Sequence, residues 1–151
     1  MKRFMLDTSA VGQLEEEGTD PSVLGAANAE FYITHVQEDE LRNITDAQFR
    51  KEMMKLLNTV RDRDVPTDSF VWDVSRWGRA KWGASTPMTT IRKELRDDDG
   101  NELRDALIAG TAVTEGMTLV THDGELRDAM LKHYQNQVWT MERFLRWVRS
   151  Q

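Results

Sequence analysis

The sequence contains no cysteine among its 151 residues. Disulfide bonds and thiolate metal sites are therefore excluded. No apolar run approaches the length of a membrane span, and the first one ends at Asp7, too early for a secretory signal. There is also no repeat, low-complexity segment or linker that would divide the chain. We therefore expect a cytoplasmic, unprocessed protein with one domain, residues 1–151.

The charge balance limits the partners. The formal net charge is -6, although charged residues make up 30% of the chain. The protein as a whole does not attract nucleic acid, so binding to it requires a local basic surface or a bridging cation.

Short apolar segments alternate with helical patterns along the chain. Strands are expected at 2–6, 31–33, 117–120 and 138–139, with an edge element or turn at 65–66. Helices are expected at 10–17, 20–29, 46–61, 69–81, 101–115, 125–133 and after 140. Capping boxes at Thr34–Gln37 and Thr45–Gln48 open two helices, and 83–100 is expected to be irregular apart from a helical turn at 91–96. Strands that alternate with helices without hairpin turns predict an α/β fold with a mostly parallel sheet of about five strands.

One stretch, from Asn101 to Leu126, organises the rest. Its helix carries the run DALIAGTAVT, which is apolar nearly all round and therefore typical of a buried helix. Asp105 lies within that run, and a carboxylate in such a place needs a partner. The following strand delivers Thr121 and Asp123 just past its C-terminal end, where open α/β sheets place their ligands. We expect Asp105 and Asp123 to meet in space.

Two more acids are candidates for the same edge of the sheet. Asp7 follows the first strand, where a helix cap is an equally good interpretation. Asp123 taken alone is also typical of a turn or a cap. The acids of the run 38–40 lie near the start of a helix, where the positive end of the helix dipole stabilises negative charge. Such acids usually face solvent. The helical period nevertheless turns Glu40 inward and leaves Glu38 and Asp39 outside the apolar arc.

Together these acids predict a metal site. Two carboxylates about 4 Å apart repel by about 4 kcal/mol at an effective dielectric near 20, so four cannot share a pocket unaided. Either protons or a divalent cation must settle the charge. Oxygen ligands suit Mg²⁺ or Mn²⁺, and the lack of cysteine and of paired histidines argues against zinc. Such a site binds phosphate and can activate water for an in-line displacement.

The segments that hold these acids resemble the PIN-domain nuclease family, most of all the VapC-type toxins of toxin–antitoxin systems. The similar segments are LDTS with Asp7, ITHVQEDELRN with Glu40, DALIAGTA with Asp105 and LVTHD with Asp123. Their order and spacing fit the family over nearly the whole chain. Two features depart from it: Leu126 stands where the family often has an aromatic residue, and 83–100 is longer than the usual connection.

The resemblance implies a three-layer α/β/α PIN-like fold and metal-dependent cleavage of RNA. It implies that Asp7, Glu40, Asp105 and Asp123 are the catalytic residues and hold Mg²⁺ or Mn²⁺. Supporting residues that steady the carboxylates or the water at the metal would be Thr8, Ser9 and Thr121. The resemblance also suggests a homodimer and a small cognate antitoxin that blocks the site.

One locally basic region is interleaved with tryptophans. Its residues are Arg76, Arg79, Lys81, Arg92, Lys93 and Arg96, with Trp72, Trp77 and Trp82 between or beside them. One interpretation is a phosphate-tracking surface with a stacking platform. The other, at least equally good, is that the tryptophans are core and the basic side chains solvated.

Three rival functions use similar patterns. A haloacid-dehalogenase-like phosphotransferase needs a second aspartate where Ser9 stands, and a receiver-like domain needs paired acids and a lysine that are not evident. A PIN-like module could hold RNA or a protein without cutting, although the presence of all four acids argues against it. A nuclease outside toxin–antitoxin systems, or one acting on DNA, stays open.

Overall fold

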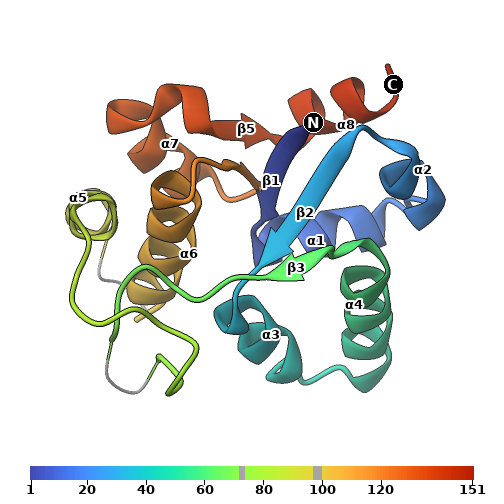
Figure 1. The fold of residues 1–151 in the computed structure, drawn as a ribbon. Coiled ribbons are helices and arrows are strands. Elements are labelled where there is room, and N and C mark those ends of the chain that lie inside the picture. The colour runs from blue at the N-terminus through green and yellow to red at the C-terminus, as the bar shows by residue number, and fades with distance from the viewer. Residues whose placement is uncertain (72–73, 97–99) are drawn as a thin grey trace.

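The α/β prediction is confirmed by a five-stranded, all-parallel sheet with helices on both faces (Figure 1). The computed structural model describes residues 1–71, 74–96 and 100–151. The sheet order is β3-β2-β1-β4-β5. The strands are β1 (Lys2–Leu6), β2 (Ala29–Ile33), β3 (Arg63–Asp64), β4 (Thr118–Thr121) and β5 (Val138–Thr140).

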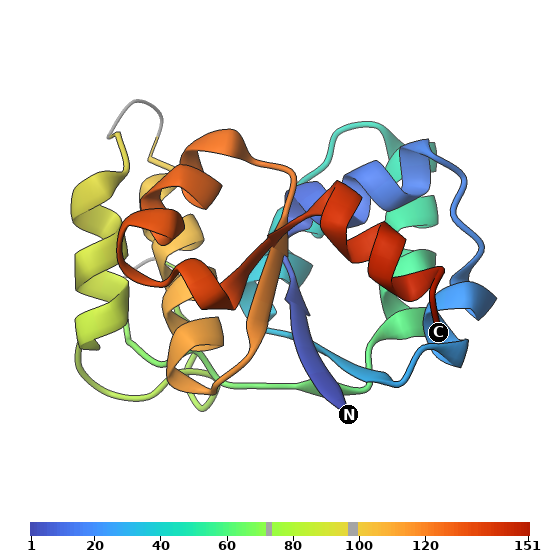
Figure 2. The same cartoon turned by 90° about the horizontal axis from the view of Figure 1, so that it is seen from above.

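Alternation of side chains along the strands divides the core into two layers. Phe4 and Leu6 of β1 enter one apolar cluster, and Met5 between them enters the other. The first cluster packs against α1 (Thr8–Glu16), α2 (Pro21–Ala26), α4 (Ala47–Val60) and α8 (Met141–Val148). The second packs against α5 (Thr86–Glu94), α6 (Glu102–Thr114) and α7 (Gly124–His133). The result is a three-layer α/β/α arrangement, seen from above in Figure 2.

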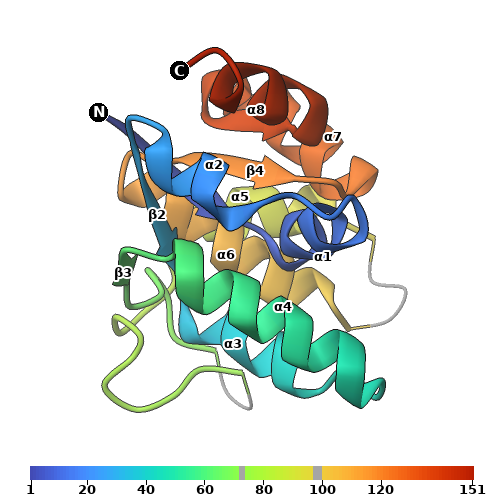
Figure 3. The same ribbon diagram turned by 90° about the vertical axis from the view of Figure 1, so that its right-hand side faces the viewer.

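Two short helices complete the fold. Helix α3 (His35–Arg42) follows β2 and contributes Val36 to one cluster and Leu41 to the other. It runs beside α4 below the sheet edge (Figure 3). A 3-10 turn, η1 (Gln135–Gln137), leads into β5. None of the described helices has the length and hydrophobicity needed to span a lipid bilayer.

The strand order reverses beside β1. The chain moves outward from β1 through β2 to β3, then returns to the other side of β1 for β4 and β5. The C-terminal ends of β1 and β4 are therefore neighbours, and the backbone N–H of Asp7 donates to the Val120 carbonyl oxygen at 3.0 Å. Ligands of open α/β sheets bind in the crevice that such a reversal creates.

Short polar side chains cap several of the helix starts, and the two capping boxes expected from the sequence have different outcomes. The capping box of Thr34 and Gln37 is present at the start of α3. The box expected at Thr45 is wrong: the Asp46 carboxylate instead accepts the Phe49 N–H at 2.9 Å. Asp46 is the residue adjacent to the helix, and it is the one that can reach the first free amides.

The helix expected at 69–81 is wrong. The described part of this segment forms turns, and Trp72 and Asp73 lie outside the described residues. Thr67 N–H donates to the Arg79 carbonyl at 3.0 Å, and Lys81 N–H donates to the Thr67 carbonyl at 2.8 Å. The chain thus satisfies its backbone by pairing across the segment rather than along a helix. The expected helix 20–29 is also too long, because α2 ends at Ala26 and Ala29 already begins β2.

The segment 83–100 is more regular than expected, although 97–99 lie outside the described residues. Helix α5 begins after Ser85, whose hydroxyl accepts the Met88 N–H at 3.1 Å, and it ends at Glu94. It packs closely on α6 at Gly110, where an added Cβ would lie 2.8 Å from the Met88 Cα. The sequence indicated only a turn at 91–96 because this helix is stabilised by a neighbour far away in the chain.

Candidate active site

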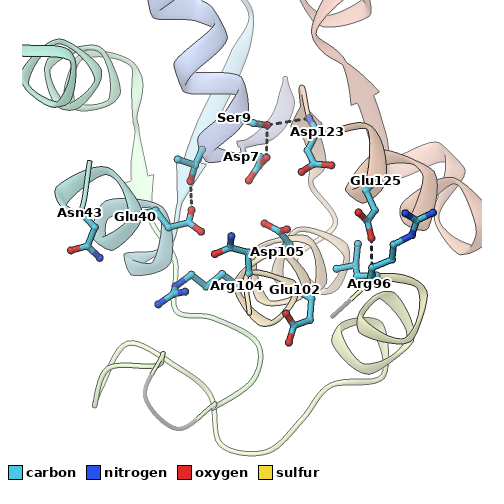
Figure 4. A pocket seen from close by; sticks show the side chains of 13 residues that line it. Asp7, Ser9, Glu40, Asn43, Arg96, Glu102, Arg104, Asp105, Asp123 and Glu125 are labelled. Atoms are coloured by element: carbon cyan, nitrogen blue, oxygen red, sulfur yellow. Dashed lines mark hydrogen bonds between the residues drawn. The ribbon is translucent and has the colours of Figure 1, made fainter. Parts of the chain in front are cut away.

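A cleft of about 510 Å³ opens at the strand-order reversal, between the ends of β1 and β4 and the starts of α6 and α7 (Figure 4). All four acids expected at the site line it. The acidic lining residues are Asp7, Glu40, Glu102, Asp105, Asp123 and Glu125. The other lining residues are Thr8, Ser9, Asn43, Leu95, Arg96, Asn101 and Arg104.

Asp7 is the most deeply buried of these acids, at 3% exposure. Its Oδ2 accepts hydrogen bonds from the hydroxyls of Ser9 at 2.6 Å and Thr121 at 3.0 Å. Burial raises the pKa of the carboxyl, the two hydroxyls oppose that rise, and the charge of Asp123 adds to it. Asp7 occupies the N-cap position of α1, as its place after the strand indicated, but its side chain makes no capping hydrogen bond and lines the cleft instead.

Glu40 reaches the cleft from α3, as the helical period predicted. The Thr8 hydroxyl donates to its Oε2. Burial raises its pKa to about 7, and the charge of Asp7 adds to the rise. The Thr8 hydrogen bond and the positive charge of Arg104 oppose it. At neutral pH this carboxyl is therefore poised between its neutral and charged forms.

The helical wheel was wrong about Glu38. This side chain is buried, at 7% exposure, and pairs with Arg61 at the end of α4. Asp39 pairs with Arg76 and is half-buried. A wheel sees only the helix on which a residue lies, whereas the partner of Glu38 comes from another element.

Asp105 and Asp123 enter the cleft from the first turn of α6 and from the turn after β4. Asp105 is half-buried rather than enclosed by apolar residues, because the first turn of α6 opens into the cleft and the fully buried part follows it, 106–112. The Asp123 carboxylate accepts the Leu126 N–H at 2.9 Å, so this residue is a helix cap as well as a lining residue. Figure 4 shows both carboxyl groups turned toward the same space as those of Asp7 and Glu40.

The residues expected to support the acids make the corresponding contacts. Ser9 Oγ, besides donating to Asp7, accepts the N–H groups of His122 at 3.1 Å and Asp123 at 3.2 Å. Thr121 Oγ1 accepts the Asp123 N–H at 3.0 Å. The turn after β4 is thereby tied to the start of α1, which fixes Asp7 and Asp123 relative to each other.

Three charged residues of this cleft were not expected from the sequence, namely Glu102, Glu125 and Arg104, whereas Arg96 was expected only in the locally basic region. Glu102 precedes Asp105 by three residues, a spacing that places both on one side of α6 and could have indicated it. Its side chain is buried, and within the described residues its Oε2 has no hydrogen-bond partner. Figure 4 shows it turned away from the four acids that were expected at the site. Glu125 accepts the backbone N–H of Arg96 at 2.6 Å, and no sequence signal linked Glu125 or Arg104 to the site.

The donor set fits a hard divalent cation. The carboxyls of Asp7 and Glu40 have raised pKa values in a cleft that holds six acids against Arg96 and Arg104. A bound cation would reduce the repulsion between the carboxylates. Oxygen donors without histidine or cysteine suit Mg²⁺ or Mn²⁺. As the side chains stand, no three acidic or histidine residues of the described chain are grouped closely enough to hold a metal ion. Binding would therefore require the carboxylates to draw together.

Comparison with known proteins bears on the fold alone. No protein-family model matches the chain, and no curated protein matches it. Among solved structures the chain is similar to the crystal structure of PAE2754 from Pyrobaculum aerophilum, with a TM-score of 0.57 and 17% sequence identity. The alignment covers 99% of this chain and 91% of the other.

Proposed function

We propose that this protein is a metal-dependent endoribonuclease of the PIN-domain type, most similar to the VapC toxins. One observation carries the proposal: four carboxylates from four separate elements, Asp7, Glu40, Asp105 and Asp123, line one cleft where the strand order reverses. Burying acids side by side destabilises a fold, and the pKa values of Asp7 and Glu40 are raised accordingly, first by burial and to a lesser extent by the neighbouring carboxylate. A bound Mg²⁺ or Mn²⁺ ion would offset this unfavourable charge.

The chain's own residues suit phosphodiester hydrolysis. A bound divalent cation would supply the positive charge that offsets the phosphate and activates water. Ser9 and Thr121 hold the Asp7 carboxylate in one orientation, and Thr8 does the same for Glu40. The acids of the cleft repel a phosphate in the absence of the cation, so hydrolysis should depend strictly on it.

The resemblance leads us to propose partners as well. These are an RNA substrate, a cognate antitoxin protein that blocks the cleft, and a second copy of the chain in a homodimer. A cytoplasmic location is part of the same proposal.

The test compares wild type with Asp105→Asn on labelled structured RNAs and single-stranded DNA, in Mg²⁺, in Mn²⁺ and in EDTA. We expect cleavage of RNA that requires the metal and falls in the variant by at least the roughly 10- to 100-fold that even outer-shell changes cost at metal sites. Asp128→Asn is the matched control, because Asp128 is an exposed acid on α7 outside the cleft. It should cleave as wild type does.

Two results would overturn the proposal. Cleavage that survives in Asp105→Asn would mean a different site or a contaminant. Metal-dependent binding of RNA without cleavage of any substrate would favour the binding module instead.

A further inference from the structure

The segment 67–83 presents an aromatic cluster, which we define as Phe70, Trp77 and Trp82. Trp77 is 72% exposed and Trp82 is 69% exposed, so the interpretation of these two as core is wrong. Trp72 lies outside the described residues. The rings of Phe70 and Trp82 stack with centroids 4.8 Å apart, and Trp77 meets Trp82 edge-on at 5.1 Å. Large exposed rings of this kind usually mark a binding surface.

The cluster has an ordered base. Phe70 N–H donates to the Gly83 carbonyl at 2.8 Å, which joins the two ends of the segment that carries the rings. Asp68 is buried and accepts hydrogen bonds from the hydroxyls of Ser85 and Thr114, and its N–H donates to Thr111 on α6. A surface held in this way loses little conformational freedom when a ligand binds.

A second groove adjoins the candidate active site on the side of Arg104. A cleft of about 270 Å³ shares two lining residues, Asn43 and Arg104, with the acidic cleft. Its other lining residues are Val36, Asp39, Arg42, Val74 and Arg76. Arg76 lines the groove and directly precedes Trp77, so the aromatic cluster begins one residue along the chain from the groove.

The groove is positive in an otherwise acidic chain. Arg42, Arg76 and Arg104 line it, and Asp39, which pairs with Arg76, is the single acid among its described lining residues. The chain as a whole has a net charge of -6. This local reversal complements a phosphate backbone.

We propose that the groove and the aromatic cluster form a base-stacking subsite for single-stranded nucleic acid. Phosphates leaving the acidic cleft follow Arg104, Arg42 and Arg76, and unpaired bases stack on Trp77 and Trp82. The identity of the ligand rests on the proposed function. A nucleic acid fits better than a protein because the groove beside the cluster shares Asn43 and Arg104 with the acidic cleft and is lined by arginines. Stacking accepts any base, whereas paired bases hide their faces.

The test measures binding in EDTA, where cleavage is not needed. The probe is a fluorescently labelled RNA of about 12 nucleotides, within the site sizes of known single-strand binders, used alone or annealed to its complement. The double variant Trp77→Ala/Trp82→Ala should weaken single-strand binding by about 10-fold or more, since each stacked base contributes that much. Trp77→Phe/Trp82→Phe keeps aromatic faces and should bind nearly as wild type. Val23→Ala, which trims an exposed apolar residue on α2, is the matched control.

A second variant tests the phosphate path. Arg42→Ala should reduce the slope of log Kd against log salt concentration by about 0.7, the value for one lost phosphate contact on a single strand. It should do so without altering the quenching of tryptophan fluorescence at saturating RNA. An unchanged slope would remove Arg42 from the path.

The outcomes separate the two proposals. Equal affinity of wild type and the double alanine variant overturns the stacking subsite and leaves the nuclease proposal untouched. Equal loss for duplex and single strand, or a change in self-association with no change in RNA affinity, also overturns it, because the cluster would then serve another contact. Tryptophan-dependent binding by a protein that cleaves nothing supports the subsite while the nuclease proposal fails.

Discussion

Glu40→Gln should change how the stability of the protein depends on pH. Burial raises the pKa of Glu40 from 4.5 to about 7. Between those values the folded protein keeps a proton that the unfolded chain releases, so the free energy of unfolding falls as pH rises from about 4.5 to about 7. At 1.36 kcal/mol per pH unit the whole effect is about 3 kcal/mol. Glutamine has nearly the same shape and no charge, so the variant lacks this loss.

The assay is urea unfolding of wild type and Glu40→Gln in EDTA at several pH values from 4 to 8. The two proteins should be about equally stable near pH 4, and the variant should gain on wild type as pH rises, by up to about 3 kcal/mol at pH 8. Mg²⁺ or Mn²⁺ at pH 8 should restore part of the difference in wild type, because a ligand of the folded state stabilises it. Glu16→Gln, at an exposed position of α1, is the matched control and should show no such trend.

A difference between wild type and Glu40→Gln that is the same at every pH would refute this reasoning. It would mean that the variant acts through packing or through the Thr8 hydrogen bond rather than through a buried charge. An opposite trend, with wild type gaining as pH rises, would mean that the folded state favours the ionised carboxyl.

Two further predictions concern packing and a buried ion pair, both measured by urea unfolding. Gly110→Ala should destabilise the protein by about 1–3 kcal/mol, because its Cβ would lie 2.8 Å from the Met88 backbone. Gly25→Ala, a helical glycine with open space around it, is the control, and equal effects of the two changes would refute the close approach. Arg61→Ala should cost about 1–3 kcal/mol because it leaves the buried Glu38 carboxylate without its main partner. A neutral result would mean that water or Arg79, whose guanidinium lies 3.9 Å from the Glu38 carboxylate, replaces the lost partner.

Much of the fold could be predicted from local pattern. The strand Lys2–Leu6 has the predicted bounds, and the strands around Tyr32, Val120 and Trp139 differ from prediction only at their ends. Short apolar runs bounded by polar residues are sufficient for this, since a strand buried on both faces is apolar along its whole length whichever elements pack on it. Helix α5 and the turns of 67–83 could not be predicted in this way. Their hydrogen bonds and packing involve α6 and residues across the segment.

The four acids expected at the site could be predicted from the sequence for a similar reason. Asp7 and Asp123 follow strands, and the helical period turned Glu40 toward the interior, so their meeting follows from a parallel sheet. The burial of Glu38, by contrast, could not be predicted from the helical period. Its burial depends on Arg61 at the end of another helix.

The sequence by itself determined the fold class, four of the five strands and four of the six acids that line the cleft, because each is marked by residues a few positions apart. Only the tertiary structure decided that the strand order reverses between β1 and β4, that Arg104 links the acidic cleft to a positive groove, and that Trp77 and Trp82 face outward. The physical reason is that the burial of a side chain and the electrostatic potential around it depend on all the atoms nearby in space. Most of those atoms belong to residues that are distant in the chain.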